Sequence, residues 1–203
     1  MNMPPPHAAQ PGGTPIAIGA VIGGRFQIER AVSEDALGAV LAAKDQKTGK
    51  PIALRMLPKR LVEGAAASEA LRAGVRTAAA MPHKNLVAAY GAGQDPRAGW
   101  YVAGEWIDGE QLSQIVEHRR SAGLGGTSVR GAIDVVVQIC AALTAVHLKT
   151  VHGGVRPSVV WVAKNGRVKL GDLGVTRALL KGAGAAAFGA AEQAWLAPEV
   201  KAG

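Results

Sequence analysis

The sequence contains a single cysteine, and aromatic residues make up only 4% of its 203 positions. One cysteine cannot form a disulfide within the chain, which is typical of proteins that stay in the reducing cytoplasm. Cys140 follows Ile133 and Val136 at helical spacing, so we expect it to be buried on an apolar helix face. Because aromatics are scarce, the core has to be built from Val, Leu, Ile and Ala.

Long apolar runs and dense blocks of charge are also missing. No uninterrupted stretch of eighteen apolar residues occurs, so we expect no membrane-spanning segment here. The start of the chain lacks the basic and apolar regions of a signal peptide, which again favours the cytoplasm. The net charge is +8, but Lys and Arg are scattered and no aromatics are interleaved with them. Nucleic-acid-binding proteins concentrate positive charge in a patch, so we expect no nucleic-acid partner.

Hydrophobic residues still account for 48% of the chain, enough for one domain or two small lobes. Residues 1–24 are rich in Pro, Gly and Ala and should form a disordered tail, with order beginning near Arg25. The following pattern predicts strands and helices in an α+β order. The expected strands are residues 25–28, 40–43, 52–57, 86–90, 100–107, 159–162 and 167–170, and the expected helices are 65–80, 110–120 and 128–148. The low complexity of residues 178–191 predicts a mobile segment.

Several motifs together resemble the bacterial Ser/Thr protein kinases in both order and spacing. Residues 81–87 resemble the His-Pro-Asn-Ile-Val segment after helix C, and residues 152–159 resemble the catalytic loop. Residues 166–174 resemble the Asp-Phe-Gly strand and turn, and residues 197–199 match the Ala-Pro-Glu end of the activation segment. Each motif is weak alone, but the combined resemblance covers nearly all of residues 25–203.

The resemblance implies a protein kinase-like two-lobed fold. A five-stranded N-lobe with helix C, followed by the hinge, would span residues 25–107, and a partial, mainly helical C-lobe would span residues 108–203. Kinases continue beyond the Ala-Pro-Glu motif with the helices that bury the core of their C-lobe. We therefore expect this chain to be a piece of a longer protein, or its long helix to be covered by another chain.

The residues that resemble the glycine-rich loop are poorly suited to a triphosphate. The family reads Gly-x-Gly-x-x-Gly-x-Val there, whereas this chain reads Ser33-Glu34-Asp35-Ala36-Leu37-Gly38-Ala39-Val40. Glycines let backbone N–H groups approach phosphates closely, and only Gly38 remains. Asp35 and Glu34 would place negative charge beside the phosphates. We expect an ordinary strand-turn-strand hairpin.

Three positions lack the side chains that phosphoryl transfer needs. The resemblance places the catalytic carboxylate at Gly154, the metal-holding Asn at Val159 and the helix C Glu at Gly74. Glycine cannot accept a proton, and valine offers no oxygen to Mg²⁺. The resemblance therefore implies that no intact catalytic residue remains at these positions.

Four other positions that resemble motif positions of the kinase family still carry charged or polar residues. Arg55 replaces the strand Lys, and we expect either a partly exposed charge or a weak anion-binding group. Arg156 replaces the phosphate-facing Lys of the catalytic loop, and His152 is expected to be a packing residue. Asp172 is the one intact metal-type carboxylate, and we expect it to be a weak Mg²⁺ ligand or to cap a turn.

The resemblance also marks a weak nucleotide pocket. Gly104 falls at the gatekeeper position and opens space behind the pocket, and we expect Trp161 to fill that space instead of stacking on a base. No cofactor is expected to bind strongly, and ATP with Mg²⁺ would bind weakly. The residues of this pocket would be Val40, Ala53, Arg55, Glu105, Ile107 and Trp161.

The expected activation segment has no hydroxyl to phosphorylate, because no Ser, Thr or Tyr lies between Arg177 and Glu199. Catalysis and its control are therefore lost together. This favours a pseudokinase, meaning a regulatory or protein-binding module whose partner is an active kinase or the rest of a longer chain. Two alternatives remain. One is a weak or atypical Ser/Thr protein kinase that uses Asp172 and Arg55 with ATP, and the other is a nucleotide sensor that works without metal.

Overall fold

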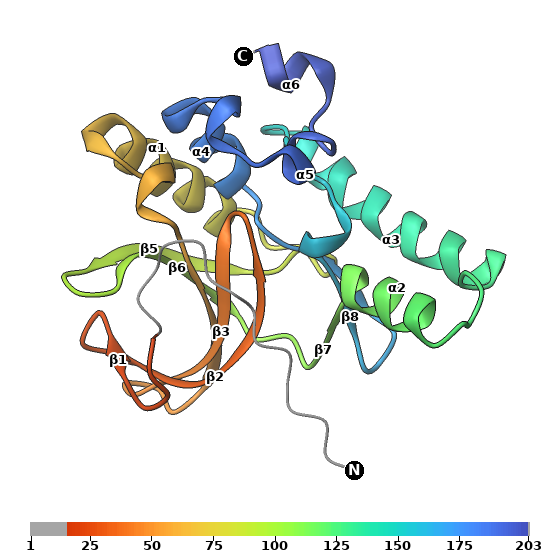
Figure 1. Ribbon diagram of the computed structural model, residues 1–203, viewed down its shortest axis with the longest axis horizontal. Helices are drawn as coiled ribbons and strands as arrows, with labels where there is room; N and C mark the ends of the chain where they lie inside the picture. Colours follow the sequence, from red (N-terminus) through yellow and green to blue (C-terminus); the bar gives the residue numbers. More distant parts are fainter. Residues whose placement is uncertain (1–15, 203) are drawn as a thin grey trace.

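Six antiparallel strands form the larger sheet, in the order β1-β2-β3-β4-β6-β5 (Figure 1). The computed structural model describes residues 16–202. Apolar side chains that alternate along β2, β3 and β4 bury one face of the sheet, with Ile28, Leu41 and Leu54 at the centre of this core. The strands are β1 (Val21–Ile22), β2 (Phe26–Asp35), β3 (Gly38–Asp45), β4 (Pro51–Met56), β5 (Ala89–Asp95) and β6 (Gly99–Glu105).

The sheet begins earlier in the chain than composition predicts. Val21 and Ile22 pair with the start of β2, and Ile22 is buried. The expected start of order near Arg25 is therefore wrong, and so is the expected disorder of residues 21–24; residues 1–15 lie outside the described part. Two apolar residues before a Gly-Gly turn are enough to add a short strand, and the surrounding Pro and Gly content hides this signal.

Helix α1 (Gly64–Ala79) lies beside helix α4 (Val175–Ala183), as Figure 1 shows. α1 buries residues three or four positions apart, which is the spacing of one helix face. Together with Leu37 and Trp100, both helices form a second core. The buried residues of α1 are Ala67, Leu71, Val75 and Ala78, and those of α4 are Val175, Thr176, Ala178 and Leu179.

The prediction of a mobile segment at residues 178–191 is wrong. Most of α4 and a single 3₁₀ turn, η3 (Ala185–Ala187), lie in this segment, and both Leu179 and Phe188 are buried. The many small residues permit close packing: a methyl group at Gly182 would lie 2.7 Å from Cβ of Ala67 on α1. Low complexity here therefore reflects a tight helix–helix contact and not disorder.

The second half of the chain combines a small sheet with helices. The expected helix at 110–120 begins two residues late, because residues 109–111 pair with β8 instead. The expected strand at 86–90 is displaced as well, because Leu86 makes only an isolated bridge to Leu170 before β5 begins. The elements are β7 (Gly109–Gln111), β8 (Val160–Ala163), β9 (Val168–Leu170), α2 (Leu112–Ser121), α3 (Val129–His147), α5 (Ala190–Gln193) and α6 (Pro198–Ala202), with single turns η1 (Lys59–Leu61) and η2 (Pro157–Val159).

Helix α3 is apolar on more than one face. Ser128 caps its start by accepting a hydrogen bond from the backbone N–H of Gly131 at 3.1 Å. Ala142 and Val146 pack into the core under β8 and β9. Cys140 is exposed, so its expected burial is wrong: it lies on the outer face, away from Ala142 and Val146. The exposed large residues of this helix are Val129, Ile133, Val136 and Val137.

By length and composition alone, α3 is the one helix among residues 16–202 that could cross a membrane. Core helices that pass the same criteria are mostly buried, whereas α3 packs only its inner face against β9 and 11% of its apolar window is buried. The expectation that no segment spans a membrane rests on uninterrupted apolar runs, and it stays a prediction.

Gly74→Ala is expected to lower the free energy of unfolding by about 1–3 kcal/mol. The added methyl group would overlap the backbone carbonyl of Gly174, the residue just before α4. This sign is opposite to intrinsic helix propensity, which favours Ala by about 1 kcal/mol. Denaturant unfolding measures the difference. Gly125→Ala is the matched control, because nothing lies within 4 Å of its added methyl group. A stabilised Gly74→Ala variant would contradict the close contact of α1 with the start of α4.

Candidate functional site

Two arginines and two aspartates from distant parts of the chain meet between the larger sheet and the helical part. Arg55 on β4 donates from Nη1 to Asp35 Oδ1 at 2.9 Å and from Nε to Asp172 Oδ1 at 3.0 Å. Arg156 donates from Nη2 to the second oxygen of each carboxylate, at 3.4 Å in both cases. Each carboxylate therefore bridges both guanidinium groups, and we call these four residues the charge cluster.

The charge cluster is buried and electrically balanced. Its side chains are between 6 and 16% exposed. Burial by itself opposes the charged form of Arg55, but the carboxylates of Asp172 and Asp35 outweigh it and raise the pKa of this guanidinium. Removing one partner from a buried pair costs about 3–5 kcal/mol, because the other charge is then left without compensation. The four side chains therefore hold one another in place.

Arg55 is not the partly exposed charge that was one of the two expectations from the sequence; weak binding of an external anion stays a prediction. It is buried, and the anions that it binds belong to the chain itself. A guanidinium presents several donors in a planar fork, so one side chain can engage two carboxylates. Glu69 on α1, the nearest acidic residue to the expected helix C position, instead pairs with Arg76 at 2.8 Å on the surface.

Asp35 enters the charge cluster because the hairpin between β2 and β3 turns within two residues. Its Oδ1 also accepts a hydrogen bond from the N–H of Leu37 at 2.9 Å, which fixes the turn. Gly38 follows with a φ of 111°, and any side chain there would overlap the carbonyl of Met56. The expected hairpin is confirmed. The inward direction of Asp35 was not predicted, although Asp in place of a loop glycine, together with Arg in place of two Lys, is a signal for it.

Asp172 has a φ of 59°, a left-handed conformation that Asp tolerates better than most residues. Its backbone carbonyl accepts from the N–H of Val175 at 3.0 Å and so begins α4, while its carboxylate takes no part in the turn. Both carboxylate oxygens face guanidinium groups, which repel a cation. The expected role of Asp172 as a turn-capping side chain is therefore replaced by a role in the charge cluster.

These residues do not fit the magnesium ions that phosphoryl transfer uses. Val159, the expected second ligand position, is buried in the apolar core under β8 and β9. Across residues 16–202, no three His, Cys, Asp or Glu side chains gather where they could hold a metal ion. With both carboxylates of the charge cluster already paired to the two arginines, no step of a reaction is assigned to a metal here.

The space at the two glycine positions is occupied by α4 and the residues that begin it. A side chain at Gly154 would overlap the side chain of Thr176, which is buried and accepts a hydrogen bond from Arg156 Nη1 at 3.3 Å. A side chain at Gly74 would overlap the backbone of Gly174. Neither position can therefore regain a carboxylate unless the start of α4 moves.

His152 supports the segment that leads to Asp172. Its ring is almost fully buried, and Nε2 lies 2.8 Å from the carbonyl oxygen of Gly171, so the nitrogen donates in the neutral tautomer with its proton there. Burial lowers the pKa of this imidazole from its ordinary value. The contact agrees with the expected packing role of His152.

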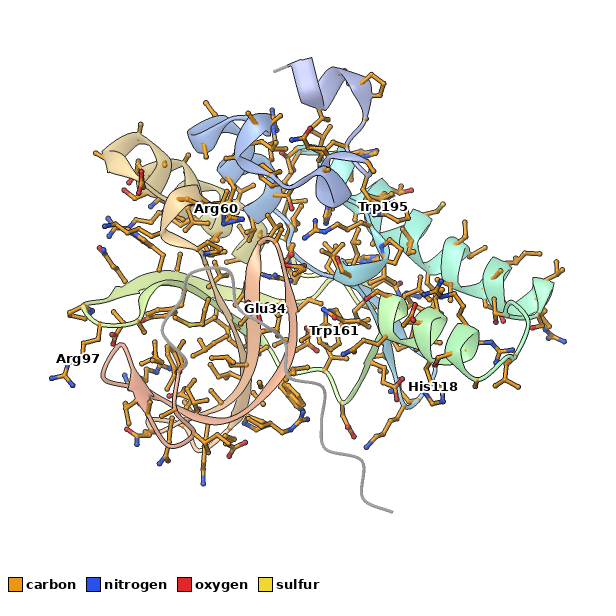
Figure 2. The ribbon with its side chains drawn as sticks, viewed as in Figure 1. Glu34, Arg60, Arg97, His118, Trp161 and Trp195 are labelled. Atoms are coloured by element: carbon orange, nitrogen blue, oxygen red, sulfur yellow. The ribbon has the colours of Figure 1, made fainter. Side chains whose placement is uncertain are left out.

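All six expected pocket residues line one cavity of about 80 Å³. Ligand pockets for drug-sized molecules typically measure about 300–1,000 Å³, so this cavity is too small for a whole nucleotide without rearrangement. Trp161 occupies part of the region: it packs against Val40 and Ile107, and it lies beside the β2–β3 hairpin in Figure 2. Whether any nucleotide binds stays a prediction.

Trp161 has no atom within 4 Å of a methyl group placed at Gly104. The atoms nearest to a methyl group at Gly104 would be the carbonyl oxygen of Ala88 at 3.0 Å and a methyl of Val87 at 4.0 Å. Trp161 and Gly104 line the same cavity, so the expectation that Trp161 takes up the gatekeeper space stays a prediction. Glu105, beside Gly104, is held by Lys169 Nζ at 2.8 Å and by the N–H of Ala88 at 3.1 Å.

A model of the protein kinase domain matches residues 26–202. The chain belongs to the protein kinase family. Serine/threonine-protein kinase PknA of Mycobacterium tuberculosis is 26% identical over 167 residues, which are 80% of this chain and 38% of PknA. Serine/threonine-protein kinase PknB of Mycolicibacterium smegmatis is 27% identical over 159 residues, 76% of this chain and 25% of that kinase. The chain therefore spans well under half the length of these relatives.

A solved kinase domain shows the same fold. The crystal structure of the PknI kinase domain of M. tuberculosis superposes with a TM-score of 0.68 at 20% identity, covering 79% of this chain and 64% of that one. The α+β protein kinase fold expected from the motifs is confirmed, with β1 as a sixth, two-residue strand in the N-terminal sheet.

The lowered pKa of His152 predicts a pH dependence of stability. As pH falls below the ordinary value of about 6.5, the unfolded chain takes up a proton before the folded chain does, so the free energy of unfolding decreases. The slope from this one group is at most about 1.4 kcal/mol per pH unit. His152→Gln should flatten the slope between pH 7 and 5, measured by denaturant unfolding. The exposed His118, changed to Gln, is the control; equal slopes in all three proteins would refute this role of burial.

Proposed function

We propose that this chain is a pseudokinase, a kinase-like module that acts as a regulatory or protein-binding domain and does not transfer phosphate. The charge cluster carries the proposal. Arg55 and Arg156 correspond to the two lysines that face phosphates in the family, and here both are neutralised by Asp35 and Asp172. Phosphoryl transfer depends on free positive charge and bound metal at this place.

The surroundings of the charge cluster support the same proposal. The catalytic carboxylate has no counterpart, because Gly154 is packed against Thr176. The second metal position is the buried, apolar Val159. General-base assistance alone contributes about 10²–10⁴ in rate, so the lack of a carboxylate at Gly154 is a large loss by itself. The relatives are named as serine/threonine kinases, and that activity is not carried over to this chain.

We further propose that the partner is a protein, either an active kinase domain or further residues of a longer chain. The exposed apolar side chains of α3 support this, because several of them follow one another along a single helix. No nucleic-acid partner is proposed, because no concentrated basic patch is evident in the sequence. The cytoplasm is the proposed location.

Phosphate transfer from radiolabelled ATP with Mg²⁺, to the chain itself and to a basic protein substrate, tests the proposal. The expected result is no transfer above background for the wild type and for Asp172→Ala alike. Transfer by the wild type that disappears in Asp172→Ala would show an atypical kinase instead. A ligand-dependent rise in melting temperature with ATP and EDTA, without any transfer, would favour the metal-independent sensor.

Gly154→Asp combined with Val159→Asn is expected not to create kinase activity. The new carboxylate has to displace Thr176, the new amide enters an apolar core, and Arg55 and Arg156 still face internal carboxylates. Burying an amide without partners also costs about 1–3 kcal/mol, so the double variant should be less stable. The same transfer assay is the readout, with a melting curve to show that the protein is folded. Measurable turnover would mean that the charge cluster does not block the site.

A further inference from the structure

The two carboxylates of the charge cluster differ in how firmly the surrounding backbone holds them and in how exposed they are. Asp172 lies between the Gly171 carbonyl held by His152 and the backbone bond that begins α4. Asp35 sits at the turn of a hairpin, and its side chain is the most exposed of the four at 16%. Its neighbour Glu34 is exposed. Asp35 is therefore the member that can leave the charge cluster with the least disturbance elsewhere.

Without the charge of Asp35, two guanidinium groups would face one carboxylate. Arg55 Nη1 would lose its short bond of 2.9 Å, and Arg156 Nη2 would lose one of its two contacts at 3.4 Å. Arg156 Nε is already buried without a hydrogen-bond partner. Unpaired guanidinium donors in a poorly solvated place bind oxyanions strongly, and a phosphate offers several oxygens and about two negative charges.

The charge cluster also adjoins the apolar cavity. Arg55 and Asp172 line that cavity together with Val40, Ala53 and Trp161. A ligand with a phosphate at the arginines would therefore extend its other end toward apolar side chains. A planar base joined to a phosphate chain has this combination of groups, and the cavity of about 80 Å³ has to widen to admit the base.

We propose that Asp35 is an internal anion that takes the place of a ligand phosphate between Arg55 and Arg156, and so determines that the cleft rejects nucleoside polyphosphates. The inference deepens the proposed pseudokinase function and rests on it, because it explains why the cleft would not bind ATP. The carboxylate acts in two ways: it satisfies the donors that a phosphate would use, and it repels an incoming anion.

Asp35→Asn is the informative change, with Glu34→Gln as its matched control on the same hairpin. The amide oxygen of Asn can still accept from the N–H of Leu37, so the turn keeps its hydrogen bond while the charge is removed. Glu34 is exposed and makes no contact within the charge cluster. The two variants change net charge by the same amount, which separates a local effect from a general one.

The experiment measures melting temperature against ATP, pyrophosphate and adenosine in EDTA, each protein being compared with its own ligand-free state. At a ligand concentration about fivefold above Kd, binding should raise the melting temperature of Asp35→Asn by roughly 2–4 °C. ATP and pyrophosphate should both act, while adenosine should not distinguish Asp35→Asn from the wild type. The wild type and Glu34→Gln should show no shift up to about 5 mM ATP. Adding Arg156→Gln to Asp35→Asn should abolish the gain.

Each outcome is decisive. A folded Asp35→Asn that shows no shift overturns the inference and leaves the pseudokinase proposal intact, whereas phosphate transfer by the wild type overturns the pseudokinase proposal. Equal shifts in the wild type and Asp35→Asn also overturn the inference, because Asp35 would then exclude nothing. If Asp35→Asn does not fold, Asp35→Ser replaces it and both are refolded with about 10 mM pyrophosphate. Rescue by that anion supports the inference, and failure of both variants to fold with it contradicts the inference.

Discussion

Two buried guanidinium groups need two carboxylates, and this requirement organises the centre of the molecule. The carboxylates come from the hairpin between β2 and β3 and from the residue just before α4, while the arginines come from β4 and from the loop before η2. A neutral contact therefore joins the sheet to the helical part without help from a ligand. At the positions that resemble the phosphate-binding parts of the family, the arginines and aspartates of this chain bind one another.

Close packing also occurs where α1 meets α4. Glycine at 74 lets the helix touch the backbone of Gly174, and Thr176 fills the space beside Gly154. The segment that corresponds to an activation segment is thereby part of the core, with Leu179 and Phe188 buried among residues of the N-terminal half. The close contacts at Gly74 and at Gly154 therefore both depend on where α4 begins.

Much of the fold could be predicted from sequence because its signals are local. Short apolar runs locate most strands, alanine content locates α1, helical spacing locates α3, and motif order identifies the kinase fold. The charge cluster could not be predicted in this way, because Arg55 and Asp172 lie 117 positions apart and nothing local shows that they meet. The order of α4 and the exposure of Cys140 also depend on which faces have partners. Low complexity indicates disorder for the first, and helical spacing indicates burial for the second; both indications are wrong.

The individual substitutions complement one another chemically. An ammonium group is a compact point charge suited to one phosphate, whereas a guanidinium fork can hold two carboxylates at once. Arg at 55 and 156 therefore fits a chain that carries Asp35 in place of a loop glycine, and Asp35 would be unfavourable without these cations, because its carboxylate would be buried unpaired. A cleft that satisfies its own charges keeps one arrangement of the sheet and the helical part whether or not a nucleotide is present. The proposed role in docking would benefit from that constancy, since preorganisation lowers the entropy lost on association.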